Sequence, residues 1–416
     1  MKFANAQEVI SYLYSLPHLH PKNDLSFIKK VLAELGNPQD KVKTIHITGT
    51  NGKGSTSYYL SNLLKKAGQK TGLFVSPYVY RFNERIQLNN QDISDDDLVK
   101  AANIVQAACD RLEKFSLVTF EYEVAIAFVY FAQKKCDYAV IEVGIGGEHD
   151  KTNVITPEVS VITTIGLDHE KIIGPTIQDI AREKSGIIKN HRSVVLGNVP
   201  QNVLLILLEK AKAENASVYQ LGKDFDVSVA KEINYDDPNH SLTFKLRPKV
   251  EAFDIAVAFK AFSLLKLNLS TAEIEQAINQ TTIPGRYQIL QKKPLIILDG
   301  AHNIQAMTNL LNVVHAIAKQ KQGHVYALVT MMKDKDLEQV FDLFDKQDQV
   351  LLTTLSYPRV AKENDFPIDV QRRYNYEGNY QTGFTELKKK LNDNDILLVT
   401  GSFYLVSAIL NWKGKK

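Results

Sequence analysis

The amino-acid sequence predicts an α/β protein of two domains: a mostly parallel N-terminal sheet flanked by helices, with a small antiparallel addition, and a smaller α/β C-terminal domain. Three observations predict this fold. Short apolar runs alternate with helical stretches, a glycine-rich loop joins the first apolar run to a helix, and a Pro-Gly break at residues 284–285 separates two such series. The chain has 416 residues, enough for two domains.

The first series begins with the apolar run 44–48, the loop Gly49-Thr-Asn-Gly-Lys-Gly-Ser55, and a helix with Leu60, Leu63 and Leu64 on one face. Further strands are expected at 71–75, 138–143, 159–163 and 193–197, and helices at 95–115 and 124–134. Runs that are apolar on both faces and separated by helices are typical of a parallel sheet covered on both sides.

Residues 220–250 have a different pattern. The segments 224–230 and 241–246 alternate polar and apolar residues around a polar turn at 234–239, which predicts an antiparallel hairpin. A helix at 254–267 follows, and then a second α/β series with strands at 294–299, 325–330, 350–354 and 396–400. We therefore expect one domain at 1–283 and another at 284–416, with ligand bound in a cleft between them at the carboxyl ends of their strands.

The composition argues against several classes of protein. The net charge of +3 is too close to balance to predict a nucleic-acid surface, and no run of about 18 apolar residues could span a membrane. The N-terminus lacks the basic and apolar regions of a signal peptide. Cys109 and Cys136 are too few to form a disulfide framework, so we expect buried thiols in a reduced, cytoplasmic protein.

The loop at residues 49–55 lies between a strand and a helix, as a phosphate-binding loop does. Its glycines let backbone N–H groups approach a polyphosphate, and the helix N-terminus adds partial positive charge. Lys53 can reach the terminal phosphates, and Ser55 or Thr56 can offer a hydroxyl to Mg²⁺. The strict pattern has glycine in place of Ile47 and a hydroxyl residue in place of Gly54. The alternative is therefore a glycine turn that binds nothing.

Three further side chains of the first series are candidates for a nucleotide site. Glu142 closes a buried strand, where a carboxylate can hold Mg²⁺, although it could instead cap a helix or pair with a lysine. His169 follows the strand 159–165, but a lone histidine is more often a core imidazole than a metal ligand. Lys184 is by residue type an ordinary helix lysine, because an ammonium cannot ligate Mg²⁺ without conversion, for example to a carbamate.

The second series offers two more candidates. Arg286 follows a Pro-Gly pair and could clamp a phosphate with both arms of its guanidinium. Asp299 ends a strand, where an acid suits a ribose hydroxyl; the alternative is a helix N-cap. Since no Ser or Cys has the local signature of a nucleophile–base triad, the set favours phosphoryl chemistry, in which positioning and charge neutralisation do most of the catalysis.

These motifs, in this order, resemble the Mur ligase superfamily, and within it the folylpolyglutamate synthases and dihydrofolate synthases. The resemblance covers nearly the whole chain, and the asparagine in the phosphate loop, Asn51, is specific to the folate branch. The resemblance implies a P-loop-containing N-terminal domain and a Rossmann-like C-terminal domain. Besides the loop, the matching segments are Leu35-Gly-Asn-Pro38, Ser76-Pro77, Glu84-Arg-Ile86, Glu142-Val-Gly-Ile-Gly-Gly147, Thr152-Asn153, Gly166-Leu-Asp-His169, Ile180-Ala-Arg-Glu-Lys-Ser-Gly186, Pro284-Gly-Arg286, Asp299-Gly-Ala-His-Asn303, Lys333-Asp-Lys-Asp336, Gly401-Ser402 and Tyr404-Leu-Val406.

The resemblance implies an ATP-dependent ligase. ATP would phosphorylate the terminal carboxylate of a folate, or of dihydropteroate, to an acyl phosphate. The amine of L-glutamate would then attack it, and ADP and phosphate would leave. The resemblance also implies two Mg²⁺ sites and a monomer, and it leaves K⁺ open as a further ion.

The resemblance assigns roles residue by residue. The catalytic residues would be Lys53, Glu142, His169 and Lys184. Mg²⁺ would be held by Ser55, Ser76, Glu142, His169 and Lys184 as a carbamate. ATP would be bound by Gly49, Thr50, Asn51, Gly52, Lys53, Gly54, Ser55, Thr56, Asp254, Arg286, Asp299 and His302. The loop beside the folate would carry Pro77, Tyr78, Arg81, Phe82, Glu84 and Arg85.

The chain departs from the usual family sequence around substrate and adenine. Glu148 replaces an arginine and so reverses a charge near an anionic cleft. Asp254 replaces an asparagine that contacts adenine, and an ionised carboxylate cannot donate that hydrogen bond. Other departures are Tyr78, Val79, Glu251 and Ile283. We expect a working ligase with altered acceptor choice or nucleotide affinity. The alternatives are a Mur-type ligase for another acid and amino acid, and a nucleotide-binding relative with little turnover.

Overall fold

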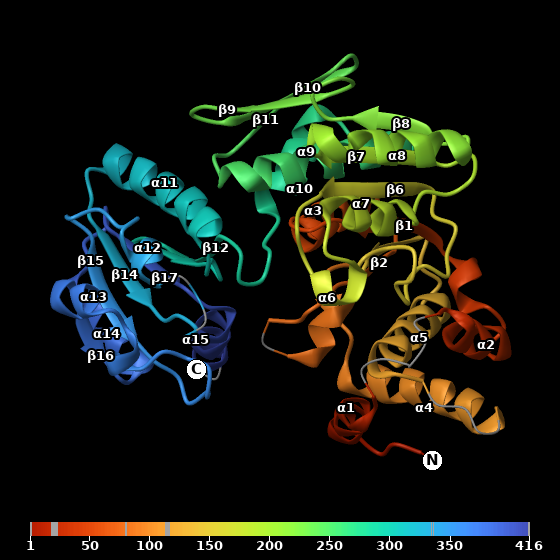
Figure 1. The fold of residues 1–416 in the computed structure, drawn as a ribbon, viewed down its shortest axis with the longest axis horizontal. Helices are drawn as coiled ribbons and strands as arrows, with labels where there is room; N and C mark the ends of the chain where they lie inside the picture. The colour runs from red at the N-terminus through yellow and green to blue at the C-terminus, as the bar shows by residue number, and fades with distance from the viewer. Residues whose placement is uncertain are drawn as a thin grey trace. The chain divides into compact units, whose positions relative to one another are not determined.

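The computed structural model, drawn in Figure 1, describes residues 2–17, 24–79, 81–112, 117–333, 335 and 337–414. The chain divides into two compact units. Unit 1 comprises residues 1–245 and 251–281, and unit 2 comprises residues 246–250 and 282–416. Asp334 and Asp336 of the motif at 333–336, and the end of the helix predicted at 95–115, lie outside the described residues.

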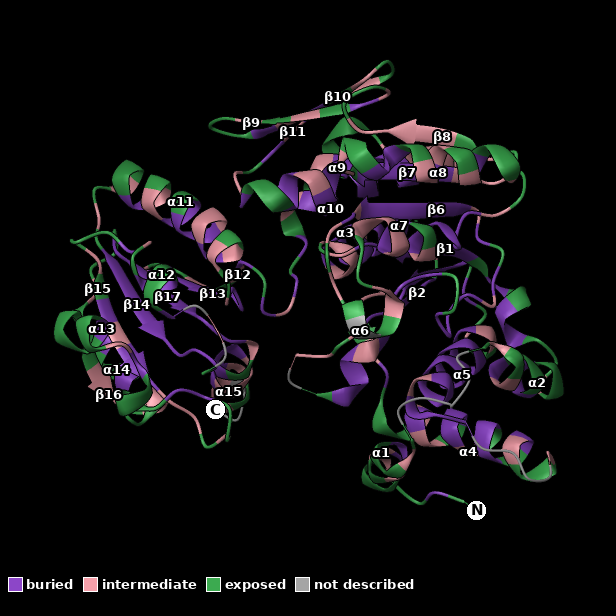
Figure 2. Cartoon of the chain, in the orientation of Figure 1, coloured by how far each residue is buried: buried purple, intermediate pink, exposed green. Residues whose placement is uncertain are grey.

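Unit 1 is built on a sheet whose described strands lie in the order β4-β3-β2-β5-β1-β6-β7-β8. Neighbouring strands from β2 to β8 are parallel, and β3 and β4 form an antiparallel edge. The central strands are buried along almost their whole length (Figure 2), which confirms the predicted parallel sheet. The strands are β1 (Lys43–Thr48), β2 (Thr71–Phe74), β3 (Ile86–Leu88), β4 (Gln91–Asp92), β5 (Tyr138–Glu142), β6 (Val159–Thr164), β7 (Ser193–Asn198) and β8 (Ser217–Gln220).

Helices surround this sheet. The helices α1, α2, α4 and α5 share a core with β2 and β5, while α7 and α8 pack on β6 and β7. These neighbours enclose α5, so it is buried on nearly all sides. The helix begins at Thr119, five residues before its predicted start. The helices are α1 (Ala6–Ser15), α2 (Ser26–Glu34), α3 (Lys53–Lys66), α4 (Asp95–Arg111), α5 (Thr119–Gln133), α6 (Glu170–Ile173), α7 (Ile177–Ser185), α8 (Gln201–Ala213), α9 (Lys249–Leu264) and α10 (Thr271–Gln280), with short 3₁₀ turns at Pro38–Lys41 and Phe82–Arg85.

The prediction of a polar turn at 234–239 is wrong. Within the described residues this region is a three-stranded antiparallel sheet of β9 (Asp226–Val229), β10 (Ile233–Asp237) and β11 (His240–Phe244), and the reversal lies at 238–239. Ile233 and Tyr235 are fully buried and anchor β10. The other residues of β10 are polar, so the strand lacks the clear alternation of apolar and polar residues that predicts a strand. The helix predicted from 254 begins at Lys249, because Ala252 and Ile255 are buried on the same helix.

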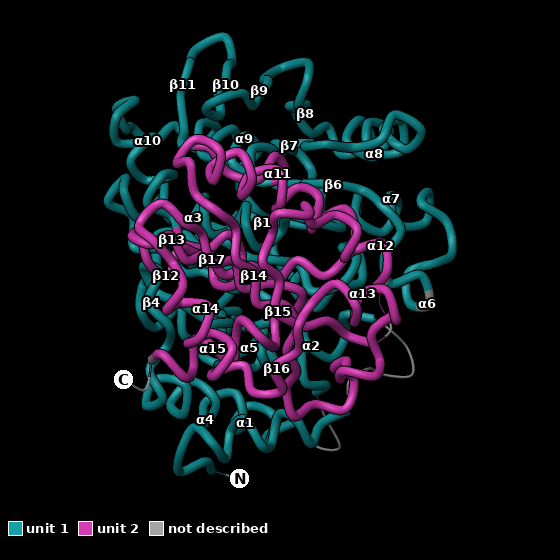
Figure 3. The backbone as a smooth tube through the Cα atoms, turned by 90° about the vertical axis from the view of Figure 1, so that its left-hand side faces the viewer, with its two compact units in different colours: residues 1–245, 251–281 teal, residues 246–250, 282–416 magenta. Residues whose placement is uncertain are grey.

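Unit 2 is a smaller α/β unit, coloured separately in Figure 3. Its described strands lie in the order β12-β13-β17-β14-β15-β16, all parallel except β12, which confirms the predicted Rossmann-like architecture. Among the described residues, none of the helices combines the length and apolarity needed to cross a membrane. The elements are β12 (Gln288–Lys292), β13 (Leu295–Leu298), α11 (Ile304–Lys321), β14 (Val325–Val329), α12 (Leu337–Phe341), β15 (Gln349–Thr353), a 3₁₀ turn (Glu363–Asp365), α13 (Ile368–Arg373), β16 (Asn375–Glu377), α14 (Tyr380–Lys390), β17 (Ile396–Thr400) and α15 (Phe403–Gly414).

The order of strands in unit 1 determines where a ligand can bind. The chain leaves β1 through α3 and passes over β5 to reach β2, and later it leaves β5 and passes over β1 to reach β6. Ligands of open α/β sheets bind at such a reversal, outside the carboxyl ends of the strands. The loop after β1, the segment after β2 and the end of β5 therefore meet at one edge of the sheet.

A buried polar cluster joins the three-stranded sheet to α9. The Asp237 carboxylate accepts hydrogen bonds from the Tyr235 hydroxyl (2.7 Å) and from Lys260 Nζ (3.1 Å), and its side chain is 1% exposed. Burial opposes its ionisation, but the hydrogen bonds from Tyr235, the Asn239 backbone and Lys260 outweigh burial and hold the pKa of Asp237 below its usual value.

We expect Asp237→Ala to lower the free energy of unfolding by about 3 kcal/mol, because it leaves the Lys260 ammonium buried without its carboxylate. Asp236 is the exposed neighbour on the same strand, and Asp236→Ala should change stability by no more than about 0.5 kcal/mol. Urea unfolding of both variants measures the difference. Equal losses would contradict a specific role for the cluster.

Candidate active site

The phosphate loop is shaped around one glycine. Gly52 precedes the first residue of α3 and has φ of +85°. A Cβ atom placed on Gly52 would lie 2.1 Å from Asp254 Oδ1, so both the backbone conformation and the close approach of α9 require glycine here. The loop thus lies directly against the carboxylate of Asp254, one of the residues that departs from the family sequence.

Two lysines converge on a single carbonyl oxygen of this loop. Lys53 Nζ donates to the Gly49 oxygen at 2.8 Å, and Lys184 Nζ, which comes from α7, donates to the same oxygen at 2.9 Å. Lys184 is only 2% exposed. Burial, followed by the positive charge of Lys53, lowers the pKa of Lys184 to about 7. Lys184 is therefore no ordinary surface lysine, because near neutral pH it is poised between an ammonium and a nucleophilic amine.

Oxygen donors lie beside the loop. The Glu142 carboxylate accepts the Ser76 N–H at 2.9 Å, and its two oxygens lie 3.6 Å from the position that a Cβ of Gly54 would take. Ser55 and Thr56 are buried in the first turn of α3, and Thr56 Oγ1 has no hydrogen-bond partner among the described residues. Carboxylate and hydroxyl oxygens in this arrangement fit a hard cation such as Mg²⁺.

A cavity of about 760 Å³ in unit 1 brings together five of the residues predicted for the site. They are Lys53, Ser76, Pro77, Arg85 and His169. His169 has a left-handed backbone (φ +49°) as the residue before α6, and its half-exposed ring lies 3.6 Å from the Asp168 carboxylate. It is therefore not the core imidazole that a lone histidine suggests. Most of the remaining wall is apolar, with Phe120, Ile145 and Ile172 among its residues.

The loop predicted beside the folate is held by its own side chains. Buried Glu84 accepts the N–H groups of Val79 and Arg81, at 2.8 and 3.1 Å, so it fixes the loop. The Arg85 guanidinium lies over the rings of Tyr78 and Phe82. Arg85, but not Tyr78, Arg81, Phe82 or Glu84, is among the residues that line the cavity.

Sequence reasoning missed several residues of the cavity wall. His149, Asp150, Lys151 and Glu183 line it, although none of these four residues was predicted to have a role in the site. Lys151 is buried, donates to the Asp24 carbonyl at 2.7 Å, and lies 3.4 Å from Glu121. One feature of the sequence could have predicted this wall: four polar residues, 148–151, directly follow the glycines after β5.

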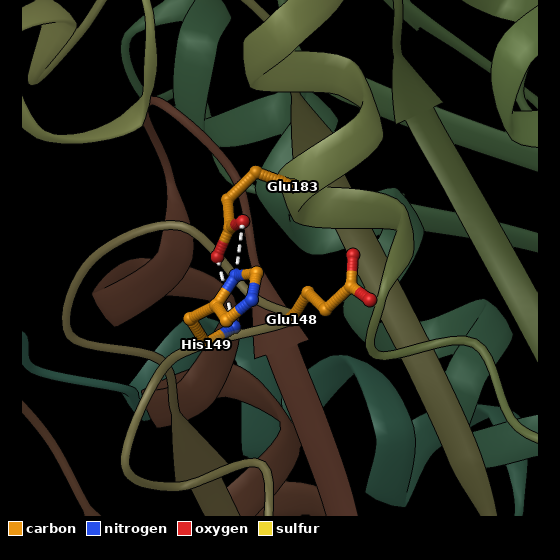
Figure 4. Close-up of side chains that lie close together, drawn as sticks. All are labelled: Glu148, His149 and Glu183. Carbon is orange, nitrogen blue, oxygen red and sulfur yellow. Dashed lines mark hydrogen bonds and ion pairs between the residues drawn. The ribbon is translucent and has the colours of Figure 1, made fainter. Parts of the chain in front are cut away.

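Glu148, His149 and Glu183 lie close together at one side of this wall (Figure 4). Glu183 Oε1 accepts the His149 N–H at 2.9 Å, and Glu183 Oε2 pairs with His149 Nδ1 at 2.8 Å. Figure 4 draws interactions between these two residues and none to Glu148. Glu183 therefore fastens the segment after β5 to α7. The exposed Glu148 is not among the residues that line the cavity.

Two other departures lie in α9. Glu251 is buried and accepts a hydrogen bond from the Tyr59 hydroxyl of α3. Its carboxylate thus serves packing between α9 and α3. Asp254 is equally buried but faces the phosphate loop at Gly52.

In unit 2, Arg286, Asp299 and His302 lie near one another. The two Asp299 oxygens accept the N–H groups of Tyr287 and Ala301, each at 2.7 Å, and burial raises the pKa of Asp299. The alternative that Asp299 is a helix N-cap is not met, because Asn303 caps α11. The Arg286 guanidinium and the His302 ring both contact Phe403.

Comparison with known protein families finds two matches. The Mur ligase middle domain matches residues 47–262, and the Mur ligase glutamate ligase domain matches residues 285–403. A folylpolyglutamate synthase from Lacticaseibacillus casei is 33% identical over 97% of this chain and 98% of its own length. A dihydrofolate synthase/folylpolyglutamate synthase from Bacillus subtilis is 30% identical over 98% of this chain and 99% of its own length.

Solved structures agree with these matches. The apo form of the Lacticaseibacillus casei enzyme has a TM-score of 0.86 and 30% identity, covering 98% of this chain and 99% of the other. Escherichia coli FolC in complex with DHPP and ADP has a TM-score of 0.81 and 26% identity, covering 99% and 98%. A bifunctional folylpolyglutamate synthase/dihydrofolate synthase from Yersinia pestis, complexed with AMPPNP and Mn ion, has a TM-score of 0.84 and 27% identity, covering 99% and 98%.

The lowered pKa of Lys184 should make the free energy of unfolding depend on pH. Its ordinary value is 10.5 and its value in the folded protein is about 7. Between these values the unfolded chain binds the extra proton, so the cost of burying Lys184 is fully present below pH 7 and disappears as the pH rises towards 10.5.

Lys184→Met should therefore raise the free energy of unfolding at neutral pH by about 2 kcal/mol, after the lost hydrogen bond to Gly49 is counted. The gain should shrink towards pH 10. Urea unfolding in buffer purged of CO₂ measures it, with Lys65→Met on the exposed surface of α3 as the control. A gain that is independent of pH, or a loss at neutral pH, would contradict the assignment.

Proposed function

Because this chain belongs to the Mur ligase family, and within it to the folylpolyglutamate synthases and dihydrofolate synthases, we propose that it uses ATP to join L-glutamate to the carboxylate of a folate or of dihydropteroate. The observation that carries this proposal is the pair of lysines, Lys53 and Lys184, on one carbonyl of a phosphate loop that borders a largely apolar cavity. Such a cavity suits a flat heteroaromatic acid, and the lysines suit the phosphates that activate it.

The reaction proceeds in two steps. The acceptor carboxylate oxygen attacks the γ-phosphorus of ATP, the bond to the bridging oxygen breaks, and ADP leaves. The amine of L-glutamate then attacks the acyl carbon, phosphate leaves with the C–O bond electrons, and the amide forms with loss of one proton. In the first step Lys53 and the backbone N–H groups of the loop neutralise charge that develops on the transferred phosphoryl group.

The residues around the loop fit Mg²⁺. Ser55, Ser76, Glu142 and His169 would hold it, since Glu142 provides carboxylate oxygens and Thr56 adds a buried hydroxyl oxygen with no partner among the described residues. When bound, Mg²⁺ draws charge from the phosphate oxygens.

Lys184 is the remaining proposed ligand, as a carbamate. An amine with a pKa of about 7 is neutral in a large fraction of molecules near physiological pH. The neutral nitrogen can attack the carbon of CO₂, forming an N–C bond and releasing one proton to water. The carbamate provides an anionic oxygen where the ammonium would repel a metal. Below pH 7 the protonated amine cannot react, so activity that depends on this carbamate falls there.

Other assignments complete the proposal. We assign residues 1–283 to the ATP-binding domain and 284–416 to the glutamate-ligase domain, in which Arg286 and Asp299 would contact phosphate and ribose, with His302 close by. K⁺ is an open further ion. Both cysteines are free, and burial raises the pKa of each to about 12, which keeps the thiols protonated and unreactive. We propose a cytoplasmic protein, as two cysteines in so long a chain form no disulfide framework. We propose a monomer that binds neither nucleic acid nor membrane.

The test is ligand-dependent phosphate release. Purified protein receives ATP, Mg²⁺ and L-glutamate with either tetrahydrofolate or dihydropteroate. Release that requires all components, with a product heavier by one glutamyl residue, is the expected result. Release with both acceptors would define a bifunctional enzyme. Absence of release with either would overturn the proposal and favour another acid acceptor or a nucleotide-binding protein with little turnover.

Asp254 generates a second prediction. Its carboxylate lies against Gly52, where an ionised carboxylate would repel a bound polyphosphate. Asp254→Asn removes this repulsion and restores an amide donor, so the KM for ATP should fall by about threefold to tenfold. Asp96→Asn, which removes the same charge from the exposed surface of α4, is the control. An unchanged KM for ATP, or the same fall in both variants, would count against the assignment.

A further inference from the structure

Strand β1 carries buried polar side chains on one face. Thr44, His46 and Thr48 alternate with Ile45 and Ile47 along it, and all five are 3% exposed or less. Buried polar atoms need hydrogen-bond partners. Thr48 Oγ1 donates to the Gly146 carbonyl at 2.5 Å, and His46 Nε2 lies 2.8 Å from Thr152 Oγ1. The strand that leads into the phosphate loop therefore also holds the segment after β5.

The proton positions in this chain of contacts follow from the donors available. Burial raises the pKa of Asp150, but both of its oxygens accept backbone N–H groups, which favour the carboxylate: Oδ1 accepts the Thr152 N–H at 3.0 Å and Oδ2 accepts the Ile145 N–H at 2.9 Å. The single hydroxyl proton of Thr152 therefore goes to Asp150 Oδ1. The Thr152 oxygen must then accept the proton of His46 Nε2, which makes His46 the Nε2–H tautomer.

The environment of His46 supports this tautomer. Its ring is fully buried, and burial, followed by the charge of Lys189, lowers the pKa of His46 to about 3. His46 Nδ1 has no hydrogen-bond partner among the described residues, as expected for the nitrogen without a proton. A neutral imidazole that donates in one direction is a fixed support, because it does not change charge in the physiological range.

Asp150 connects this support to the cavity. Asp150 is among the residues that line the cavity, with Ile145 and Lys151, whereas His46 and Thr152 are fully buried and are not among them. The carboxylate is held by the Thr152 hydroxyl, the Thr152 N–H and the Ile145 N–H, and the Gly144 N–H also contributes. A substitution of Thr152 or His46 should therefore alter the cavity wall indirectly, by changing the position of Asp150.

We propose that His46 and Thr152 are positioning residues for the acceptor substrate: through Asp150 they hold the wall formed by Ile145, Asp150 and Lys151 in the arrangement that binds the folate. This inference rests on the proposed function. It predicts that their hydrogen bonds determine the affinity for the acceptor and leave the affinity for ATP nearly unchanged, although β1 continues into the phosphate loop.

The test compares variants that remove a hydrogen-bonding group with variants that keep it. Thr152→Val removes the hydroxyl and His46→Phe removes the ring donor; each should raise the KM for the folate acceptor about tenfold, equivalent to about 1.4 kcal/mol, with the KM for ATP changed by less than about twofold. Thr152→Ser keeps the hydroxyl and should retain most of the affinity. Thr44→Val, on the same face of β1, is the control for a buried change of the same kind.

Two kinetic results would overturn the inference: an equal rise in the KM for ATP, or an equal rise in the KM for the acceptor in Thr44→Val. A direct measurement does not depend on folding of the variants. In wild-type protein labelled with nitrogen-15 histidine, His46 should remain the neutral Nε2–H tautomer from about pH 5 to about pH 8. Titration in this range, or a proton on Nδ1, would refute the chain of hydrogen bonds.

Failure of the proposed function has a different signature. Wild-type protein that neither binds nor glutamylates folate or dihydropteroate would overturn the function, and with it the role in acceptor binding. The nuclear magnetic resonance result would still decide separately whether His46 supports Asp150.

Discussion

The arrangement of the phosphate loop and its lysines depends on hydrogen bonds to the carbonyl oxygen of Gly49. This oxygen accepts hydrogen bonds from Lys53, the first residue of α3, and from Lys184, which is buried on α7. Two ammonium groups on one neutral oxygen repel each other. Together with burial, this repulsion lowers the pKa of Lys184 to about 7. Proteins retain such unfavourable groups mainly where function requires them. The packing of α7 on the sheet core keeps this arrangement in place.

Strand β1 links two parts of the site. Its carboxyl end runs into the phosphate loop, and its polar face holds the segment after β5 through His46 and Thr48. The parallel pairing of β1 with β5, in which Ile47 is opposite Glu142, places the loop and the Glu142 carboxylate at the same edge. One strand thus holds both the phosphate loop and the segment after β5, and an error in its position would disturb both.

Much of the fold follows from local pattern. The parallel strands, the phosphate loop and the second α/β series are apparent from apolar runs and glycines, because strands buried on both faces have few polar interruptions. The segment 234–237 was predicted as a turn, although it is a strand, because its polar residues include Asp237. That carboxylate is stabilised by Tyr235 and by the distant Lys260. Charge in a short segment indicates a turn only when no partner elsewhere in the chain neutralises it.

By itself, the sequence determined the family, the phosphate loop and the residues at the strand ends, because glycine spacing and apolar periodicity are local properties. Only the tertiary structure decided the contacts, burial and charge environment of those residues. It placed Lys184 on the Gly49 carbonyl, Asp254 against Gly52, and Asp150 in the cavity wall under His46 and Thr152. The physical reason is that desolvation and hydrogen bonding depend on groups more than 100 residues apart in the chain, and no local pattern records which of them meet.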